Sequence, residues 1–277
     1  MIHRRGFNPI RLLIQVILVA VGLVMVFPLF WLVSTSLRPA PELLEIPPQL
    51  LPQHWTLDNY ANAFAAAPFG TWLLNSLIFA TISTMFILLT SLVGGYILAK
   101  FKFPGNNFLF ILILATAIVP FEIYMLPVFL EVQALSLINT LPGLILPYVI
   151  LSYGIFFMRQ NVLASVPDEL LDAARIDGLS ETGIMIRLVS RLLAPAISAL
   201  AIFAYLQSWT AFIWPLLVLN DQNLFPVQLG LAQFNSSVSV NYAVLSAGAV
   251  VAMAPTVIAF LVLRRRIIEG VTLTGFR

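Results

Sequence analysis

The sequence predicts an all-α membrane protein with six transmembrane helices. Its 277 residues are 60% hydrophobic and only 9% charged, the mean hydropathy is +0.99, and the apolar residues are gathered into long runs. Soluble domains carry about 25% charged residues, and a helix needs about 20 apolar residues to cross the hydrocarbon core. Little of the chain is left for anything else, so we expect residues 1–277 to form a single transmembrane domain.

Six apolar runs set the predicted spans. They cover residues 12–33, 73–99, 108–130, 141–158, 192–219 and 243–263. The first run is longer than the apolar core of a cleaved signal peptide, about 7–15 residues, so we expect an uncleaved anchor. Several spans contain proline, which a helix bundle tolerates where neighbouring groups bind the freed carbonyls. No internal repeat is evident, which argues against secondary transporters built from inverted repeats.

The basic residues predict the orientation. Thirteen of the 14 Lys and Arg residues lie before the first span, between spans two and three, between spans four and five, or after the sixth. The exception is Arg38, in the long loop after span one. Because cytoplasmic loops are enriched in Lys and Arg, we expect both termini of this multi-pass protein to be cytoplasmic.

The composition excludes several function classes. Without cysteine there are no disulfides, Cys-ligated metals or thiol nucleophiles. The two histidines, His3 and His54, are too few and too far apart in sequence to suggest a metal site. The basic residues flank apolar runs, so they indicate topology instead of nucleic-acid binding. No glycine-rich loop is followed by Lys and Ser/Thr, so we expect no catalytic residues, metal or cofactor in this chain.

The loop between spans four and five is the most charged cytoplasmic segment. Ser165 and Asp168 have the spacing of a capping box, with Pro167 expected in the first turn of a helix. Gly178 favours the left-handed conformation in which helices end, and Ser180 can cap a second helix. The sequence therefore predicts a short helix of about three turns, about 15 Å long, standing off the membrane.

The charge of this predicted helix indicates a protein partner. Residues 168–178 include four acids and one Arg, a net charge of −3, whereas a helix lying on the anionic inner leaflet would be basic. A helix that avoids lipid but carries small and apolar side chains suits a groove on another protein. The side chains suited to such a contact are Leu170, Leu171, Ala173, Ala174 and Ile176.

The segment Leu171–Gly178 resembles the EAA loop of ABC importer permeases. Further segments that agree in order are Ser36–Pro39, Pro47–Pro48, Leu57–Tyr60, Asn75–Ser76, Ala99–Gly105, Leu137–Thr140 and Glu269–Thr272. Over nearly the whole chain they resemble the maltose-permease-like subunits of binding-protein-dependent sugar importers, specifically the shorter six-span partner of the pair. Asp172 stands where Glu is usual, and Ser190–Arg191 replaces a usual Leu-Pro pair, so we expect a straighter entry into span five.

The resemblance implies a subunit of a prokaryotic inner-membrane importer with several partners. These would be a sister permease, a dimer of ATP-binding subunits that holds ATP and Mg, an extracytoplasmic solute-binding protein and a sugar. The coupling loop, residues 165–190, would dock its coupling helix in an ATPase subunit and so bias the bundle between inward and outward access. The residues expected to make this contact are Asp168, Glu169, Leu171, Asp172, Ala173, Ala174, Arg175, Asp177 and Gly178.

Polar side chains within the spans are candidates for the substrate pathway. An ionised group at mid-bilayer costs about 2.5–3.5 kcal/mol on translocon scales, so Glu122 near the outer end of span three is the first candidate. The alternative is a packing acid near the interface. Weaker candidates are Tyr124, Asn75, Gln207 and Trp209. Aromatic and amide side chains suit sugars, but they also form interface belts and join helices.

The main alternative function is a secondary transporter or channel that works without ATP. It would need several buried acids that bind ions or protons, and only Glu122 is available. An intramembrane enzyme would need a metal cluster or a base beside a serine, and neither is evident. Within the importer interpretation, an oligosaccharide, a monosaccharide and a polyol phosphate all remain open as substrates.

Overall fold

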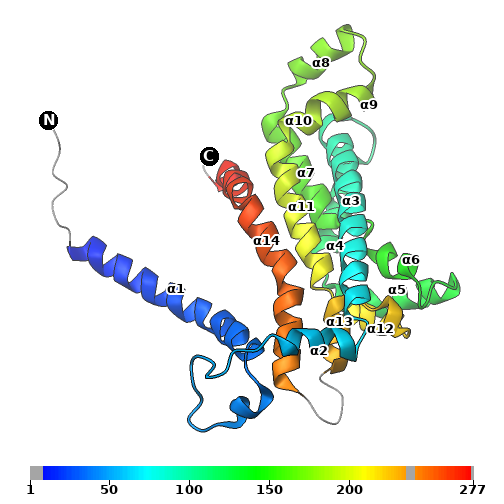
Figure 1. Ribbon diagram of the computed structural model, residues 1–277. Helices are drawn as coiled ribbons and strands as arrows, with labels where there is room; N and C mark the ends of the chain where they lie inside the picture. The colour runs from blue at the N-terminus through cyan, green and yellow to red at the C-terminus, as the bar shows by residue number, and fades with distance from the viewer. Residues whose placement is uncertain (1–8, 235–240, 276–277) are drawn as a thin grey trace. The chain divides into compact units, whose positions relative to one another are not determined.

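The computed structural model describes residues 9–234 and 241–275, which are helical with no strand in these ranges (Figure 1). The chain divides into two compact units, Met1–Ala67 with Gln233–Met253, and Pro68–Ala232 with Ala254–Arg277. The first unit contains α1 (Pro9–Ser36), the 3₁₀ turn η1 (Ala40–Leu44), α2 (Asp58–Ala66) and the first part of α14 (Tyr242–Gly275). The all-helical fold class predicted from the sequence is confirmed.

The second unit holds the remaining elements. They are α3 (Phe69–Lys100), α4 (Asn106–Ile118), α5 (Phe121–Ala134), α6 (Leu141–Ile145), η2 (Leu146–Tyr148), α7 (Ser152–Ser165), α8 (Asp168–Ile176), α9 (Glu181–Ile184), the π-helical η3 (Met185–Val189), α10 (Ser190–Leu192), α11 (Ala194–Trp209), α12 (Ile213–Val218), η4 (Gln222–Leu224) and α13 (Val227–Phe234).

The helices of the predicted spans differ in their continuity. Within the described residues, α1 and α3 are each long and apolar enough to cross a membrane. Three further spans would each be a bent pair: α4 with α5 at 102°, α6–η2 with α7 at 43°, and the helix ending at Leu192 with α11 at 84°. The apolar stretch Tyr242–Ile258 of α14 is shorter. The apolar runs expected to span over 108–130, 141–158 and 192–219 are thus helical, and each contains a break.

Prolines explain two of these breaks. Pro120 precedes α5 as its N-cap residue, and Pro195 lies in the first turn of α11. A proline lacks an N–H donor, and its ring clashes with the carbonyl four residues earlier, so a helix cannot continue smoothly into it. The straighter entry expected for span five is not found, because the helix ending at Leu192 meets α11 at 84° and Pro195 lies in the first turn of α11.

Helix α3 packs closely against α7. A Cβ atom built on Gly95 would lie 2.6 Å from Met158 Cβ and 2.8 Å from the backbone nitrogen of Arg159. A Cβ on Gly154 would lie 2.3 Å from Ser91 Oγ. Membrane helices that cross at small residues bring their backbones close together, so these glycines fix how near α7 comes to α3.

Arg38 is a structural residue of the first unit. Its side chain is buried, with Cζ 5.1 Å from the centroid of the Trp31 ring, and it donates through Nη2 to Ser34 Oγ at 2.9 Å. Asn59 Nδ2 donates to the carbonyls of Ser36 and Arg38 at 2.9 and 2.7 Å. Arg38, the one cation outside the charge pattern of the sequence, thus stabilises the loop after α1 through these contacts.

We expect Gly95→Val to destabilise the protein, because the added side chain would overlap Met158 and the backbone of α7. Overpacking costs about 1–3 kcal/mol, so the thermal midpoint of the purified protein in detergent should fall by about 2–10 °C. Gly70→Val is the matched control on the same helix, since nothing lies within 4 Å of a Cβ built there. Equal midpoints for the two variants would contradict the close packing of α3 on α7.

Candidate functional site

The helix predicted in the loop between spans four and five is present as α8, and Lys100 anchors its start. Lys100 Nζ, at the end of α3, donates to Asp168 Oδ1 at 2.5 Å and to the Val166 carbonyl at 2.6 Å. This hydrogen bond, together with the charge of Lys100, lowers the pKa of the Asp168 carboxyl. The capping-box prediction is wrong: Ser165 ends α7, Pro167 is the N-cap residue, and Asp168 binds Lys100 instead.

The end of α8 agrees with the sequence prediction. Gly178 has φ of +82°, the conformation that a side chain would strain. Its N–H donates to the Arg175 carbonyl, and the N–H of Leu179 donates to the Ala174 carbonyl, both at 3.0 Å. This is the Schellman arrangement that ends many helices. Ser180 Oγ accepts from the N–H of Gly183 at 3.2 Å and caps α9, as predicted.

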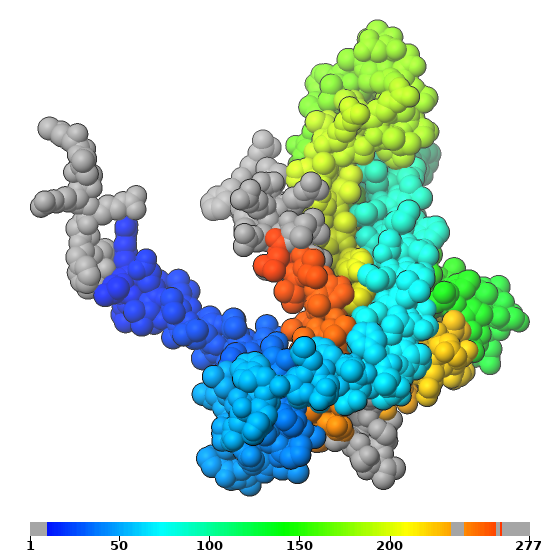
Figure 2. All heavy atoms as spheres, viewed as in Figure 1, coloured from blue at the N-terminus to red at the C-terminus, as the bar shows by residue number. Residues whose placement is uncertain are grey.

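The two faces of α8 differ in exposure. Leu171 and Ala174 are 1% and 7% exposed and pack in a core cluster with Val166 and Ile184. These two residues therefore seat α8 on its own chain, although the sequence suggested that they would contact a partner. The exposed members of the expected set are Asp168, Glu169, Asp172, Ala173, Arg175, Asp177 and Gly178. Figure 2 shows the side chains of this region forming the tip of the second unit beyond α3 and α11.

Arg175 ties α8 to α9. Its Nη1 lies 2.7 Å from Asp172 Oδ1, and its Nε lies 2.7 Å from Glu181 Oε1. Glu181 Oε2 also accepts from the hydroxyl of Tyr96 on α3 at 2.9 Å. The hydrogen bond from Arg175 lowers the pKa of Glu181, and those to Glu181 and Asp172 raise the pKa of Arg175. At neutral pH the pair is fully charged, and it weakens only as the pH falls through the folded-state pKa of Glu181.

Sequence reasoning missed Lys100 and Glu181 as parts of this site. Lys100 was read only as a topology signal, and its side chain is 8% exposed where it reaches Asp168. Glu181 lies six residues after Arg175, a spacing with no meaning within one helix, and meets it because the chain turns at Gly178. The sequence signal for these contacts was the excess of acidic residues in the loop, because surplus carboxylates can form ion pairs with nearby basic residues.

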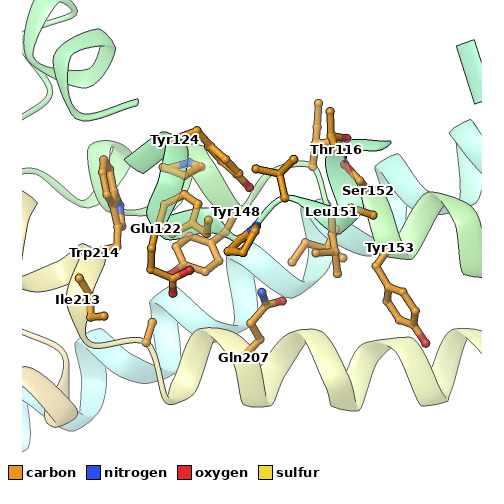
Figure 3. A pocket seen from close by; sticks show the side chains of 18 of the residues that line it. Thr116, Glu122, Tyr124, Tyr148, Leu151, Ser152, Tyr153, Gln207, Ile213 and Trp214 are labelled. Carbon is orange, nitrogen blue, oxygen red and sulfur yellow. Dashed lines mark hydrogen bonds between the residues drawn. The ribbon is translucent and has the colours of Figure 1, made fainter. Parts of the chain in front are cut away.

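A cavity of about 690 Å³ lies among α4, α5, η2, α7, α11 and α12. Three of the predicted pathway residues, Glu122, Tyr124 and Gln207, line it. Figure 3 shows Gln207 rising from α11 toward the cavity, with Glu122 and Tyr148 lying across from it. Among the described residues of the lining, Glu122 is the only Asp, Glu, Lys or Arg. The break at Pro120 places Glu122 in the first turn of α5, beside this cavity. The proline therefore ends one helix and starts another instead of only bending a single helix.

The other two predicted pathway residues lie elsewhere. Asn75 is 7% exposed, and its Nδ2 donates to the carbonyls of Asn223 and Phe225 at 2.7 and 3.2 Å. Trp209 is 1% exposed, and its ring stacks on Tyr205 with 5.8 Å between centroids. Neither residue is in the described lining of the cavity, and both are buried.

Several cavity residues were not identified from the sequence. Tyr148, Tyr153 and Trp214 contribute aromatic rings to the lining. Thr116 Oγ1 and Ser152 Oγ contribute hydroxyls that lie 2.8 Å apart. The aromatic and hydroxyl groups come from four different elements, and only the helix breaks bring them to one place. The prolines that mark those breaks were the available signal, because Pro120 and Pro147 themselves line the cavity.

Comparisons with known proteins point to one family. Residues 91–271 match the family model of the binding-protein-dependent transport system inner membrane component. The chain is 39% identical to the arabinooligosaccharides transport system permease protein AraQ of Halalkalibacterium halodurans over 93% of both proteins. It is 32% identical to the diacetylchitobiose uptake system permease protein NgcG of Streptomyces coelicolor, over 94% of this chain and 87% of that one.

A more distant relative and a solved structure extend this likeness. The sn-glycerol-3-phosphate transport system permease protein UgpE of Brucella suis is 28% identical over 96% of this chain and 98% of its own. One chain of a bacterial ABC transporter that imports the acidic polysaccharide alginate superposes with a TM-score of 0.86 at 19% identity, over 96% of this chain and 99% of that one. The likeness to this solved structure shows a shared fold.

We expect Glu181→Gln to loosen α8, because the variant loses the ion pair that joins Arg175 to α9 and α3. Amide hydrogen exchange over residues 168–178, followed by mass spectrometry, should become roughly two- to fivefold faster. Glu169→Gln is the matched control, since Glu169 is exposed and has no ion pair in the described part of the chain. If exchange is unchanged in Glu181→Gln, the network does not hold α8.

Proposed function

The chain belongs to the family of binding-protein-dependent transport system inner membrane components, and from this premise we propose that it carries an uncharged sugar across the membrane. It is a permease subunit of an ABC importer, and separate subunits hydrolyse the ATP. The observation that carries the proposal is the cavity that joins Glu122, Tyr124 and Gln207 with an aromatic lining.

The chemistry of the cavity supports an uncharged sugar. Aromatic rings such as Tyr148 and Trp214 can stack on the apolar C–H face of a sugar ring, while Gln207 and Glu122 can hydrogen-bond to hydroxyls. A phosphate or a sugar acid would call for Arg or Lys, and the described residues of the lining include neither. Two relatives are named for arabinooligosaccharides and diacetylchitobiose. We therefore favour an oligosaccharide over a polyol phosphate.

We propose six spans with both termini in the cytoplasm. The spans would be α1, α3, the bent pair α4–α5, the bent pair α6–α7, α11 with α12, and α14. The distribution of Lys and Arg supports this orientation. In this orientation α8 would lie on the cytoplasmic side and the segment 220–230 on the outer side. Broken helices in a membrane are tolerated where they line a cavity or meet protein. This fits the α4–α5 and α6–α7 pairs, whose breaks at Val119–Pro120 and Ile150–Leu151 line the cavity.

We propose that the exposed face of α8 is the coupling surface for an ATP-binding subunit. Asp172, Ala173 and Asp177 are exposed, and Ile176 is 87% exposed, an apolar side chain with no cover of its own. Leu171 and Ala174 hold the opposite face on the chain. A force applied to α8 would reach α3 through Lys100 and through the Tyr96–Glu181 hydrogen bond. A sister permease, an ATPase dimer with its ATP and Mg, and a solute-binding protein would complete the importer.

We expect Ala173→Trp to abolish sugar uptake while the protein still inserts into the membrane, because a large side chain at the centre of the coupling surface would prevent docking. ATP hydrolysis stimulated by the binding protein, measured on the complex in liposomes, should fall at least about tenfold. Ala173→Ser, which keeps the small size, should retain both activities. Wild-type uptake by Ala173→Trp would remove α8 from the coupling proposal.

We expect Gln207→Ala to lower the rate of ATP-dependent sugar uptake into proteoliposomes by about three- to tenfold, because one hydrogen-bonding side chain of the cavity is lost. Gln160→Ala is the matched control, since Gln160 is an exposed residue of α7 outside the cavity lining. The wild-type complex should prefer uncharged oligosaccharides to sugar phosphates. Preference for a phosphorylated substrate, or uptake that continues without ATP, would overturn the proposed function.

A further inference from the structure

A second pocket, of about 390 Å³, lies where α3 passes into α4. Its lining includes the end of α3, the turn at Gly105, the first residues of α4, and Arg159 from α7. It lies near the end of α3 that holds α8, because Lys100 of that end binds Asp168. In the proposed orientation this is the cytoplasmic end of the helices. None of the described residues that line this pocket lines the larger cavity.

The pocket carries two positive charges and no acid in its lining. The cations are Lys102 and Arg159. Arg159 is held in place, because its Nε donates to the Leu98 carbonyl at 3.2 Å and its Cζ lies 3.9 Å from the centroid of the Phe110 ring. These contacts leave its two Nη groups without a hydrogen-bond partner in the described part of the chain. A fixed guanidinium with free donors is well suited to phosphate oxygens.

The backbone adds further donors on the same side. Helix α4 has 13 residues and begins at Asn106 in the pocket wall. Within the described residues, the N–H groups of Asn107 and Phe108 in its first turn make no backbone hydrogen bond. Such N–H groups, at the positive end of a helix, favour an anion. They supplement the two cations.

The apolar surroundings point to an amphipathic ligand. Phe103 and Phe108 line the pocket and are 38% and 71% exposed. Beyond them α4 presents exposed Ile111 and Leu112, which continue an apolar surface along the helix. A free phosphate would gain nothing from these side chains, whereas a lipid would place its acyl chains on them. Basic pockets between membrane helices on the cytoplasmic side bind anionic headgroups.

We propose that this pocket binds the phosphate of an anionic phospholipid of the cytoplasmic leaflet, held by Arg159, Lys102 and the first turn of α4. The proposal rests on the orientation given under the proposed function. It does not depend on the substrate or on coupling through α8, because lipid binding is measured without sugar or ATP. Failure of uptake and failure of lipid binding can therefore be told apart.

The test is native mass spectrometry of the delipidated importer complex titrated with phosphatidylglycerol, phosphatidylcholine or inorganic phosphate. We expect the wild-type complex to retain phosphatidylglycerol in preference to phosphatidylcholine. The double variant Arg159→Gln/Lys102→Gln should bind phosphatidylglycerol at least about tenfold more weakly, since two charge-assisted contacts are lost. The matched control Arg187→Gln/Arg191→Gln, which removes two exposed cations from the segment 185–192, should bind as the wild type does.

Lys102→Gln alone guards against a folding defect, because Lys102 is exposed and makes no hydrogen bond in the described part of the chain. It should show a smaller loss of the same lipid. Undiminished phosphatidylglycerol binding by the double variant would overturn the proposal, and so would an equal loss in the control pair. Inorganic phosphate that competes as well as the lipid would assign the pocket to a free anion and overturn the lipid assignment.

Discussion

The polar contacts at the two ends of α3 are the constraint on which the arrangement of the second unit depends. At one end Trp72 Nε1 and Asn75 Nδ2 each donate at 2.7 Å to the backbone of residues 222–223. At the other end Tyr96 and Lys100 bind α9 and the start of α8. The whole of α3 has 32 residues and is about 48 Å long. The single helix α3 therefore contacts both the segment 220–230 and α8. A movement of α8 would strain its hydrogen bonds to α3.

The sequence was most informative where the determining contacts are local. Helical class follows from runs of apolar residues, and the end of α8 follows from the freedom of Gly178 to adopt positive φ. The start of α8 was misjudged because its anchor, Lys100, is 68 residues away from Asp168. The bend of 84° before α11 was not predicted, although Pro195 in the first turn of that helix is its signal in the sequence.

The candidate pathway was predicted only in part, for a related reason. A polar side chain in an apolar helix can face a cavity, or it can hydrogen-bond to a backbone group of its own chain. The sequence does not distinguish these two roles. Glu122 and Gln207 have the first role. Asn75 has the second, because the carbonyls it binds are about 150 residues away along the chain. Arg38 is a similar case in the first unit, because its side chain binds Ser34 and the ring of Trp31 within its own chain.

The 102° bend before α5 limits what can surround this part of the chain in a membrane. Helix α4 has 13 residues and is about 20 Å long, which is less than the hydrocarbon thickness of about 30 Å. The interrupted backbone at Val119 and Pro120 cannot face lipid tails and must meet protein or water. The break that shapes the cavity therefore also requires protein or water around it, which the cavity itself supplies on the side of Val119 and Pro120.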